Sequence, residues 1–197
     1  SRNPMVIDQR IVFDQFTDYE KLYFLGGSAN WANIRGVFQS NINNLKIFEE
    51  GSYEVEDRAD VWGIDDYDLF KESNKELTKL HKQQKPFIAY IQTATNHMPF
   101  TVPDQKETFK PLKATDISNQ LLKESGFKSI AQINALRYLD FNVDVFLRRA
   151  KESGYYDNTI FLFFGDHNTA MNKVDFLPKK EFELKTQLHH VPMFIHA

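Results

Sequence analysis

The residues best suited to chemistry in this sequence are an aspartate and a histidine that directly follow an apolar run. Residues 159–164 (Thr-Ile-Phe-Leu-Phe-Phe) precede Gly165, Asp166 and His167. A carboxylate and an imidazole at the end of a strand can bind one divalent metal, and these ligand types suit Mn²⁺, Mg²⁺ or Zn²⁺. The alternative is that Asp166 caps a turn and His167 is solvated. The apolar run and Gly165 favour a metal site.

Two further polar clusters could contact an anion. His97 lies in residues 95–100 (Thr-Asn-His-Met-Pro-Phe), and its imidazole could hydrogen-bond to an anionic substrate oxygen. Arg35 ends residues 26–35 (Gly-Gly-Ser-Ala-Asn-Trp-Ala-Asn-Ile-Arg), and its planar guanidinium suits phosphate or sulfate. The spacing places Arg35 one helical turn after Trp31. The alternatives are an exposed loop histidine and an ordinary surface arginine beside a core tryptophan.

Several other polar residues receive no catalytic role. His189 and His190 could add metal ligands, but they are adjacent, so at most one of them would face a given site on a strand. Thr93 and Thr95 have no neighbouring base in the sequence to activate them as nucleophiles. Two acidic pairs are interpreted as a helix start and a solvated turn: Asp65 with Asp66, and Glu49 with Glu50.

The elements that must position these clusters alternate between strands and helices. Apolar runs predict strands, and apolar residues three or four positions apart predict helices. This alternation predicts an α/β domain with a mostly parallel sheet and helices on both faces. The run 159–164 is apolar on both faces, which suits the centre of such a sheet. The predicted strands are 22–25, 45–48, 87–92, 159–164 and 191–196, and the predicted helices cover 31–38, 66–80 and 130–150.

Each of the three polar clusters follows a predicted strand. Ligands of open α/β sheets bind at the carboxyl ends of the strands. We therefore expect residues 26–35, 95–100 and 165–168 to meet at one edge of the sheet.

Composition limits the possible functions. The chain has 197 residues, 42% of them hydrophobic, with 24 Lys+Arg against 27 Asp+Glu. This composition is typical of a folded domain and offers no basic surface for nucleic acid, so we expect no nucleic-acid partner. No apolar run approaches the roughly 18–20 residues that span a bilayer. The sequence contains no cysteine, which excludes disulfides and thiolate ligands within these residues.

Taken together, the three clusters resemble the sulfatase-like domain of lipoteichoic acid synthases, in the alkaline phosphatase superfamily. The resemblance lies in residues 26–36, 95–100 and 158–167, which occur in the family's order. Residues 60–66 (Asp-Val-Trp-Gly-Ile-Asp-Asp) also fit the pattern. The closer likeness is to the membrane-anchored relatives of Gram-negative bacteria, and it covers essentially the whole chain.

The resemblance implies a metal-dependent transferase of the phosphoglycerol or phosphoethanolamine type, or a phosphodiesterase. Its substrate would be an anionic phospholipid or glycan headgroup, and its cofactor one divalent metal, most often Mn²⁺. Asp166 and His167 match the family's metal-binding pair, and His97 matches its substrate-contacting histidine. Trp31 and Arg35 align with the aromatic and arginine of the substrate pocket, where Asn33 is expected to share the polar role.

The family's nucleophile, a Thr or Ser, and its metal-binding Glu lie in motifs that precede the Gly-Gly segment. The 25 residues before Gly26 contain neither motif. We therefore expect residues 1–197 to form a single sulfatase-like domain that is truncated. The N-terminal part with the nucleophile and the C-terminal end would be missing, and this chain alone would be inactive.

The same resemblance predicts where the parent protein works. It implies a parent anchored in the inner membrane through a missing N-terminal transmembrane region, with this domain periplasmic or extracellular and the chain itself soluble. Two alternatives to a phosphoryl transferase stay open: a true sulfatase, which hydrolyses sulfuric esters, and a non-catalytic domain that binds anionic headgroups.

Overall fold

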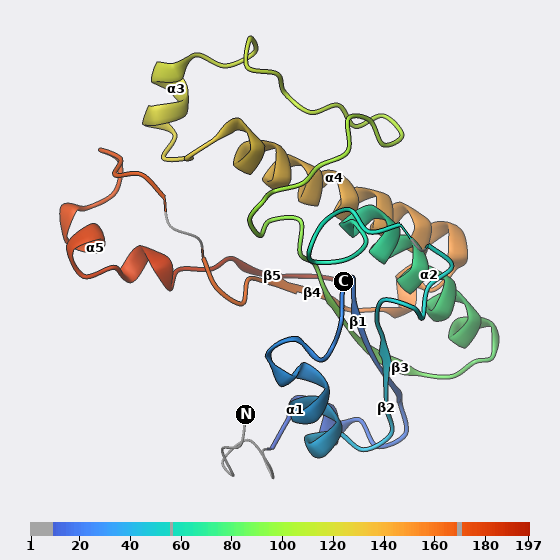
Figure 1. Ribbon diagram of the computed structural model, residues 1–197. Coiled ribbons are helices and arrows are strands. Elements are labelled where there is room, and N and C mark those ends of the chain that lie inside the picture. The colour runs from blue at the N-terminus through green and yellow to red at the C-terminus, as the bar shows by residue number, and fades with distance from the viewer. Residues whose placement is uncertain (1–9, 56, 169–170) are drawn as a thin grey trace.

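Three parallel strands form the centre of the fold. The computed structural model describes residues 10–55, 57–168 and 171–197. The strands are β1 (Glu20–Leu25), β2 (Leu45–Phe48) and β3 (Phe87–Gln92), and β1 lies between the other two. Tyr23 of β1 is aligned with Ile47 on one side and with Tyr90 on the other. The carboxyl ends of all three strands therefore lie at one edge of the sheet (Figure 1).

One face of the sheet is covered by the two long helices, α2 (Asp66–Lys82) and α4 (Ile130–Ser153). Leu22 and Phe24 of β1 point to this face and join the apolar side chains of both helices in the main core. The helices also pack against each other, and the rings of Phe70 and Phe146 stack with centroids 4.9 Å apart.

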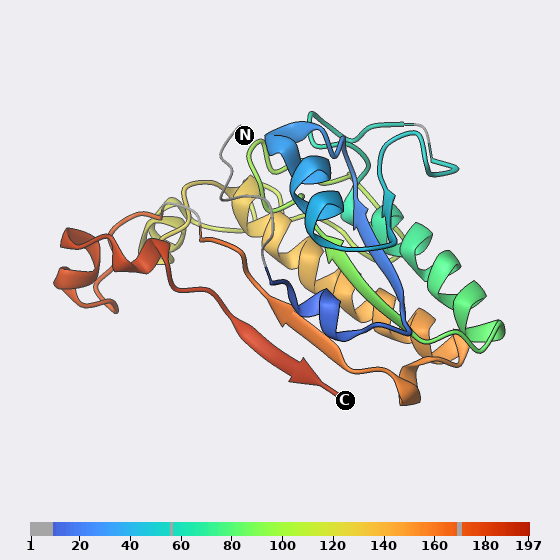
Figure 2. The ribbon, with the colours of Figure 1, turned by 90° about the horizontal axis from the view of Figure 1, so that it is seen from below.

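The opposite face is covered by the short helix α1 (Ile34–Asn41). Tyr23 and Leu25 point to this face, where Ile34 and Phe38 pack against them. Figure 1 shows α1 on one side of the strands and α2 with α4 on the other, and Figure 2 shows the same layers from below. The expected architecture, a parallel sheet with helices on both faces, is confirmed.

The ends of the long helices are set by local capping. The side chain of Asp65 accepts hydrogen bonds from the first backbone N–H groups of α2, and Ser129 does the same for α4. Gly154 ends α4 in the left-handed conformation, which a residue without Cβ adopts at little cost. These caps explain why the predicted helices begin and end close to the expected residues.

The fourth and fifth strands differ from the expectation. β4 (Phe161–Phe164) and β5 (Met193–His196) form a separate antiparallel pair, and no hydrogen bond in the described residues joins β4 to β3. The prediction that residues 159–164 form the centre of a parallel sheet is therefore wrong for this structure. A parallel return requires a long crossover, usually a helix. In the described part of the connection the helical elements are the five-residue helix α5 (Lys179–Glu183) and the short turn η5 (Thr186–Leu188), and β5 returns antiparallel to β4.

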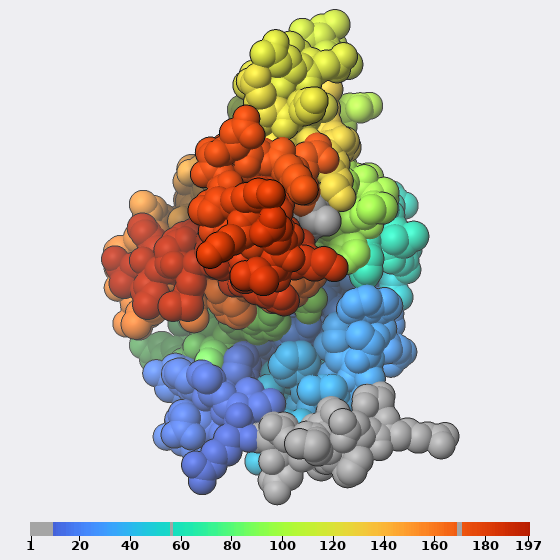
Figure 3. Space-filling model, turned by 90° about the vertical axis from the view of Figure 1, so that its left-hand side faces the viewer, coloured from blue at the N-terminus to red at the C-terminus, as the bar shows by residue number. Residues whose placement is uncertain are grey.

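The remaining elements are short. α3 (Asn119–Glu124) lies in the long excursion between β3 and α4, and the short 3-10 turns are η2 (Val12–Gln15), η3 (Trp31–Asn33) and η4 (Tyr156–Asn158). Figure 3 shows α3 (yellow) at the top of the molecule and the segment around α5 (orange-red) below it, in front of the other elements. Within the described part of the chain, no helix combines the length and apolarity that crossing a bilayer requires.

A close backbone contact joins the end of β1 to the loop before α2. Gly63 has φ +105°, and a Cβ placed on it would lie 1.9 Å from the carbonyl oxygen of Gly26. The N–H of Ile64 donates to that same oxygen at 3.2 Å. A Cβ on Gly27 would lie 2.6 Å from the carbonyl oxygen of Trp62. Only glycine permits this approach, so the loop is fixed against the strand end.

We predict that Gly63→Ala lowers the free energy of unfolding by about 3 kcal/mol or more, because it combines backbone strain with a clash. Gly51→Ala is the matched control: Gly51 has φ +82°, and a Cβ placed on it would meet no described atom within 4 Å. The control should lose only about 1 kcal/mol. Urea unfolding monitored by circular dichroism measures both. Equal losses would show that the contact with Gly26 is unimportant.

Candidate functional site

The three polar clusters meet at the carboxyl edge of the sheet through a chain of ring contacts. The rings of Trp31 and Trp62 lie edge to face with centroids 5.3 Å apart. Trp62 in turn packs on the imidazole of His97 at 4.0 Å, and His97 lies 6.2 Å from the ring of His167. The expected convergence of the clusters is therefore present in the structure.

Asp166 and His167 follow β4 in the turn that begins at Gly165. The Oδ1 atom of Asp166 accepts the backbone N–H of His167 at 2.9 Å, and it lies 4.0 Å from Nε2 of the imidazole. Nδ1 of His167 lies 3.1 Å from the backbone carbonyl of Asn168. That oxygen can only accept, so the contact suits the neutral tautomer with its proton on Nδ1, which leaves the lone pair on Nε2.

This pair fits part of a divalent metal site. The carboxylate oxygen and the imidazole nitrogen lie 4.0 Å apart, and both side chains are exposed, so a small approach of the two would let them bind one ion at about 2.1 Å from each. The Nδ1 contact supplies the outer hydrogen bond that metal-bound histidines usually make. Among the described residues, no group of three His, Asp or Glu side chains surrounds a common point. Asp166 and His167 thus provide two ligands, and a complete site needs others.

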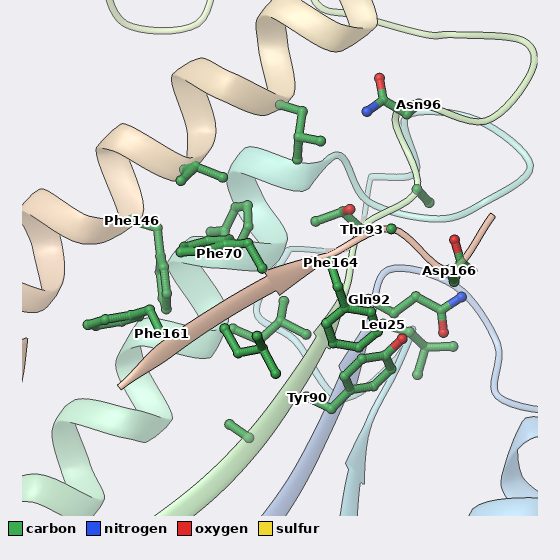
Figure 4. A pocket seen from close by; sticks show the side chains of 18 of the residues that line it. Leu25, Phe70, Tyr90, Gln92, Thr93, Asn96, Phe146, Phe161, Phe164 and Asp166 are labelled. Atoms are coloured by element: carbon green, nitrogen blue, oxygen red, sulfur yellow. The ribbon is translucent and has the colours of Figure 1, made fainter. Parts of the chain in front are cut away.

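Asp166 also places negative charge beside the ends of the parallel strands. Burial raises the pKa of Tyr90, and the Asp166 carboxylate raises it further. Burial also raises the pKa of Tyr23, with smaller contributions from Tyr90 and Asp166, and Tyr23 donates its hydroxyl proton to Gln92. Figure 4 shows Asp166 beside Gln92 and above Tyr90. A cation bound at Asp166 would compensate the negative charge of its carboxylate beside the oxygen atoms of Tyr90 and Gln92.

A large cavity opens beside these residues. Its volume is about 2200 Å³, and it is lined along its length by the facing strands β3 and β4. Trp31, Trp62, His97, Asp166 and His167 border the cavity at its polar end.

Asn33 and Arg35 are placed differently from the other predicted site residues. Neither borders the cavity that the described residues form. Ala32 and Asn33 have φ values of 48° and 61°, so the chain kinks between η3 and α1. The expectation that Trp31 and Arg35 share one helical face is therefore wrong. The side chain of Asn33 folds back over Gly36, where a Cβ would lie 2.4 Å from its Oδ1.

Arg35 is paired with Glu49, which follows β2 at the same edge of the sheet. The other carboxylate oxygen of Glu49 accepts the backbone N–H of Ala29 at 2.6 Å. The interpretation of Glu49 as part of a solvated turn is therefore wrong. Its position after a parallel strand was the available signal, since the carboxyl-end rule applies to β2 as it does to β1 and β3.

Trp62 is the second residue that the sequence did not single out as part of the site. It lies in the loop before α2 and is half-buried between Trp31 and His97. Its Nε1–H donates to the carbonyl oxygen of Met98 at 2.8 Å. No periodicity marks a loop tryptophan, so only its inclusion in the segment 60–66 associated it with the other motifs.

Asp66, in the first turn of α2, holds the turn that leads to His97. Its buried carboxylate accepts the backbone N–H groups of Ala94 at 2.8 Å and of Thr95 at 3.3 Å. Burial raises the pKa of Asp66 to about 6, although these hydrogen bonds oppose the shift. The interpretation of Asp65 and Asp66 as a helix start is correct, because Asp65 caps α2 and Asp66 is its first residue. Asp66 has the additional role of binding the backbone at the end of β3.

Comparisons with known proteins agree with this geometry. A family model described as "Sulfatase" matches residues 12–197. Lipoteichoic acid synthase 1 of Bacillus subtilis is 31% identical over 158 residues, covering 80% of this chain and 22% of that protein. Lipoteichoic acid synthase 2 of the same organism is 33% identical over 190 residues, covering 91% of this chain and 27% of that protein.

Two solved structures share the fold. The first is a protein in the alkaline phosphatase superfamily from Vibrio parahaemolyticus. Its TM-score is 0.72 at 26% identity, and the match covers 98% of this chain and 42% of that one. The lipoteichoic acid synthase LtaP of Listeria monocytogenes has a TM-score of 0.70 at 21% identity, with 93% and 44% covered, and supports the fold alone.

The fold, together with the polar residues that meet at the carboxyl ends of the strands, defines an α/β domain of the alkaline phosphatase superfamily. The chain belongs to the sulfatase family, with distant homology to lipoteichoic acid synthases over most of its length. It spans about a quarter of the length of these curated relatives.

We predict that stability falls with rising pH through the titration of Asp66. Its pKa is about 6 in the folded chain against an ordinary 3.8, so the folded state binds the proton more tightly. The contribution of Asp66 to the free energy of unfolding is therefore largest below pH 4 and decreases up to about pH 6. The loss should be on the order of 3 kcal/mol.

The control is Asp66→Asn, which keeps an acceptor oxygen but cannot ionise. Urea unfolding between pH 4 and 7 gives the difference in unfolding free energy between wild type and variant. The difference in unfolding free energy between wild type and Asp66→Asn should decrease by on the order of 3 kcal/mol as the pH rises. A difference that stays constant over this range would contradict the prediction.

Proposed function

We propose that this domain is part of a metal-dependent phosphoglycerol- or phosphoethanolamine-type transferase or phosphodiesterase. Its substrate would be the anionic headgroup of a phospholipid or glycan. The observation that carries the proposal is the contact chain from Trp31 through Trp62 and His97 to His167. These contacts bring together two exposed or half-buried aromatic rings, an imidazole that can bind a substrate oxygen, and the Asp166–His167 pair that can bind a metal.

In this proposal Asp166 and His167 hold one divalent cation, most often Mn²⁺, with Mg²⁺ or Zn²⁺ as alternatives. A bound cation of this kind polarises phosphoryl oxygens and helps to activate a hydroxyl nucleophile. Asp166 would contribute a carboxylate oxygen and His167 its Nε2 atom, the nitrogen left free by the contact of Nδ1 with Asn168.

The chain's other site residues would bind the headgroup. His97 is exposed, and its Nε2 is free to meet a phosphoryl oxygen because Nδ1 faces the Met98 carbonyl at 3.3 Å. Arg35 would exchange its partner Glu49 for a phosphate, which binds a guanidinium through the same fork of donors. Trp31, with 58% of its surface exposed, offers an apolar face to the headgroup, and Asn33 would add a polar contact.

We assign no nucleophile to this chain. Thr95 is buried, and its hydroxyl oxygen lies 3.4 Å from the backbone N–H of Asp66, so it faces the helix rather than the cavity. The proposal places the nucleophilic Thr or Ser in a part of the parent protein beyond these residues. It also places this domain outside the cytoplasm of a membrane-anchored parent. The relatives' names, which contain lipoteichoic acid, support a lipid-linked anionic substrate.

We predict that Mn²⁺ binds this chain weakly and that Asp166→Ala abolishes the binding. Removing the carboxylate leaves a single imidazole, which cannot hold the ion alone. Asp157→Ala is the matched control, because Asp157 is an exposed aspartate that precedes β4 at its other end. Isothermal titration with MnCl₂ measures all three proteins. Unchanged affinity in Asp166→Ala would remove this pair from the proposal.

We also predict that glycerol 1-phosphate binds and that His97→Gln and Arg35→Gln each weaken the affinity about tenfold, the loss of one charge-assisted hydrogen bond. Arg148→Gln is the control, since Arg148 is an exposed arginine that pairs with Asp144 on α4. Calorimetry in the presence of Mn²⁺ gives the dissociation constants, with inorganic sulfate as a second ligand. Sulfate binding without glycerol phosphate binding would favour a sulfuric ester hydrolase instead.

A further inference from the structure

Trp62 contacts both sides of the site and belongs to neither of the clusters that it joins. It comes from the loop between β2 and α2, whereas Trp31 follows β1 and His97 follows β3. Its indole lies edge to face against Trp31 at 5.3 Å and packs on the imidazole of His97 at 4.0 Å, with 48° between the ring planes. It is therefore the ring that links the two clusters.

The indole is fixed at both of its ends. At the backbone, the carbonyl of Trp62 packs against Gly27, and the N–H of Trp62 donates to Oδ1 of Asp60 at 2.7 Å. At the tip, Nε1–H donates to the carbonyl oxygen of Met98 at 2.8 Å. A side chain held in this way can orient a neighbour without touching the substrate itself.

The Met98 carbonyl connects Trp62 to the tautomer of His97. This one oxygen faces both the indole Nε1 at 2.8 Å and Nδ1 of His97 at 3.3 Å. A carbonyl oxygen has two lone pairs and can accept both protons. With its proton on Nδ1, His97 presents Nε2 as the nitrogen that is free to meet a ligand.

We infer that Trp62 is a positioning residue for His97. The stacked indole sets the plane of the imidazole, and its hydrogen bond to Met98 fixes the carbonyl that selects the Nδ1-protonated tautomer. The inference rests on the proposed function, in which His97 contacts the phosphoryl group. It assigns Trp62 the task of aiming Nε2 at that group.

Two variants separate the two parts of this role. Trp62→Phe keeps an aromatic ring against His97 but removes the N–H donor, and Trp62→Ala removes both. Val61→Ala is the control, because Val61 is the exposed neighbour in the same loop. Two quantities are measured: the proton resonances of the His97 ring, identified by their absence in His97→Gln, and the dissociation constant for glycerol 1-phosphate.

In wild type, the ring current of Trp62 should displace the His97 resonances from those of an exposed histidine. Trp62→Ala should abolish this displacement and weaken glycerol phosphate binding about tenfold. Trp62→Phe should keep most of the displacement and weaken binding about threefold, the loss of one hydrogen bond. Val61→Ala should change neither quantity.

If the His97 resonances of Trp62→Ala are the same as those of wild type, the inference is wrong. It is also wrong if the resonances of Trp62→Ala differ from those of wild type but its affinity for glycerol 1-phosphate does not. Circular dichroism of each variant shows whether it is folded, and Trp62→Phe keeps the test decisive if Trp62→Ala is not. If wild type binds no glycerol phosphate, the proposed function fails. The resonances then still decide whether Trp62 orients His97.

Discussion

Gly63 and Gly26 approach so closely that their backbones leave no room for a Cβ, and the position of the loop before α2 follows from this contact. From the same loop, Trp62 reaches the His97 turn at its exposed side, while Asp66 binds the backbone of that turn from the buried side. Two strand ends of the sheet are therefore tied together by one short segment. The arrangement of the site depends on that segment more than on any single side chain within the clusters.

Charge is balanced at this edge in two different ways. Arg35 and Glu49 form an ion pair after β1 and β2, and Glu49 also accepts a backbone N–H. Asp166 has no lysine or arginine partner among the described residues: it lies beside the imidazole of His167, and its negative charge raises the pKa of Tyr23 and Tyr90. Arg35 at one end of the site suits an anionic ligand, and the carboxylate of Asp166 at the other end suits a cation. Such a site can bind an anion that is itself bound to a cation.

Much of the central fold could be predicted from the sequence, because its signals are local. Periodicity locates α2 and α4, and short apolar runs locate the strands. For β3, Pro86 also marks the residue before the strand begins. The rule that ligands bind at the carboxyl ends of strands brought together His97 and His167, which are 70 residues apart in sequence and 6.2 Å apart between ring centroids. The two histidines meet although β4 lies outside the three-stranded parallel sheet.

Most of the features that were not predicted from the sequence depend on information that is not local. The kink needs left-handed backbone conformations at both Ala32 and Asn33. Asparagine adopts this conformation more often than most residues, but alanine rarely does, so the sequence does not predict the kink. The pairing of β4 with β5 depends on the path of the connection between them, and a run apolar on both faces carries no information about that path. Trp62 acquires its role from partners distant in sequence, and no spacing rule identifies such partners. Glu49 directly follows β2, so the rule on carboxyl ends of strands applied to it.

The junction of Trp31 and Trp62 has an optical consequence. The chain contains two tryptophans, and both lie at this one place. The intrinsic tryptophan fluorescence of the protein therefore originates entirely beside His97 and contains no signal from the core. Emission from this chain reports on the environment of the sheet edge, without any introduced label.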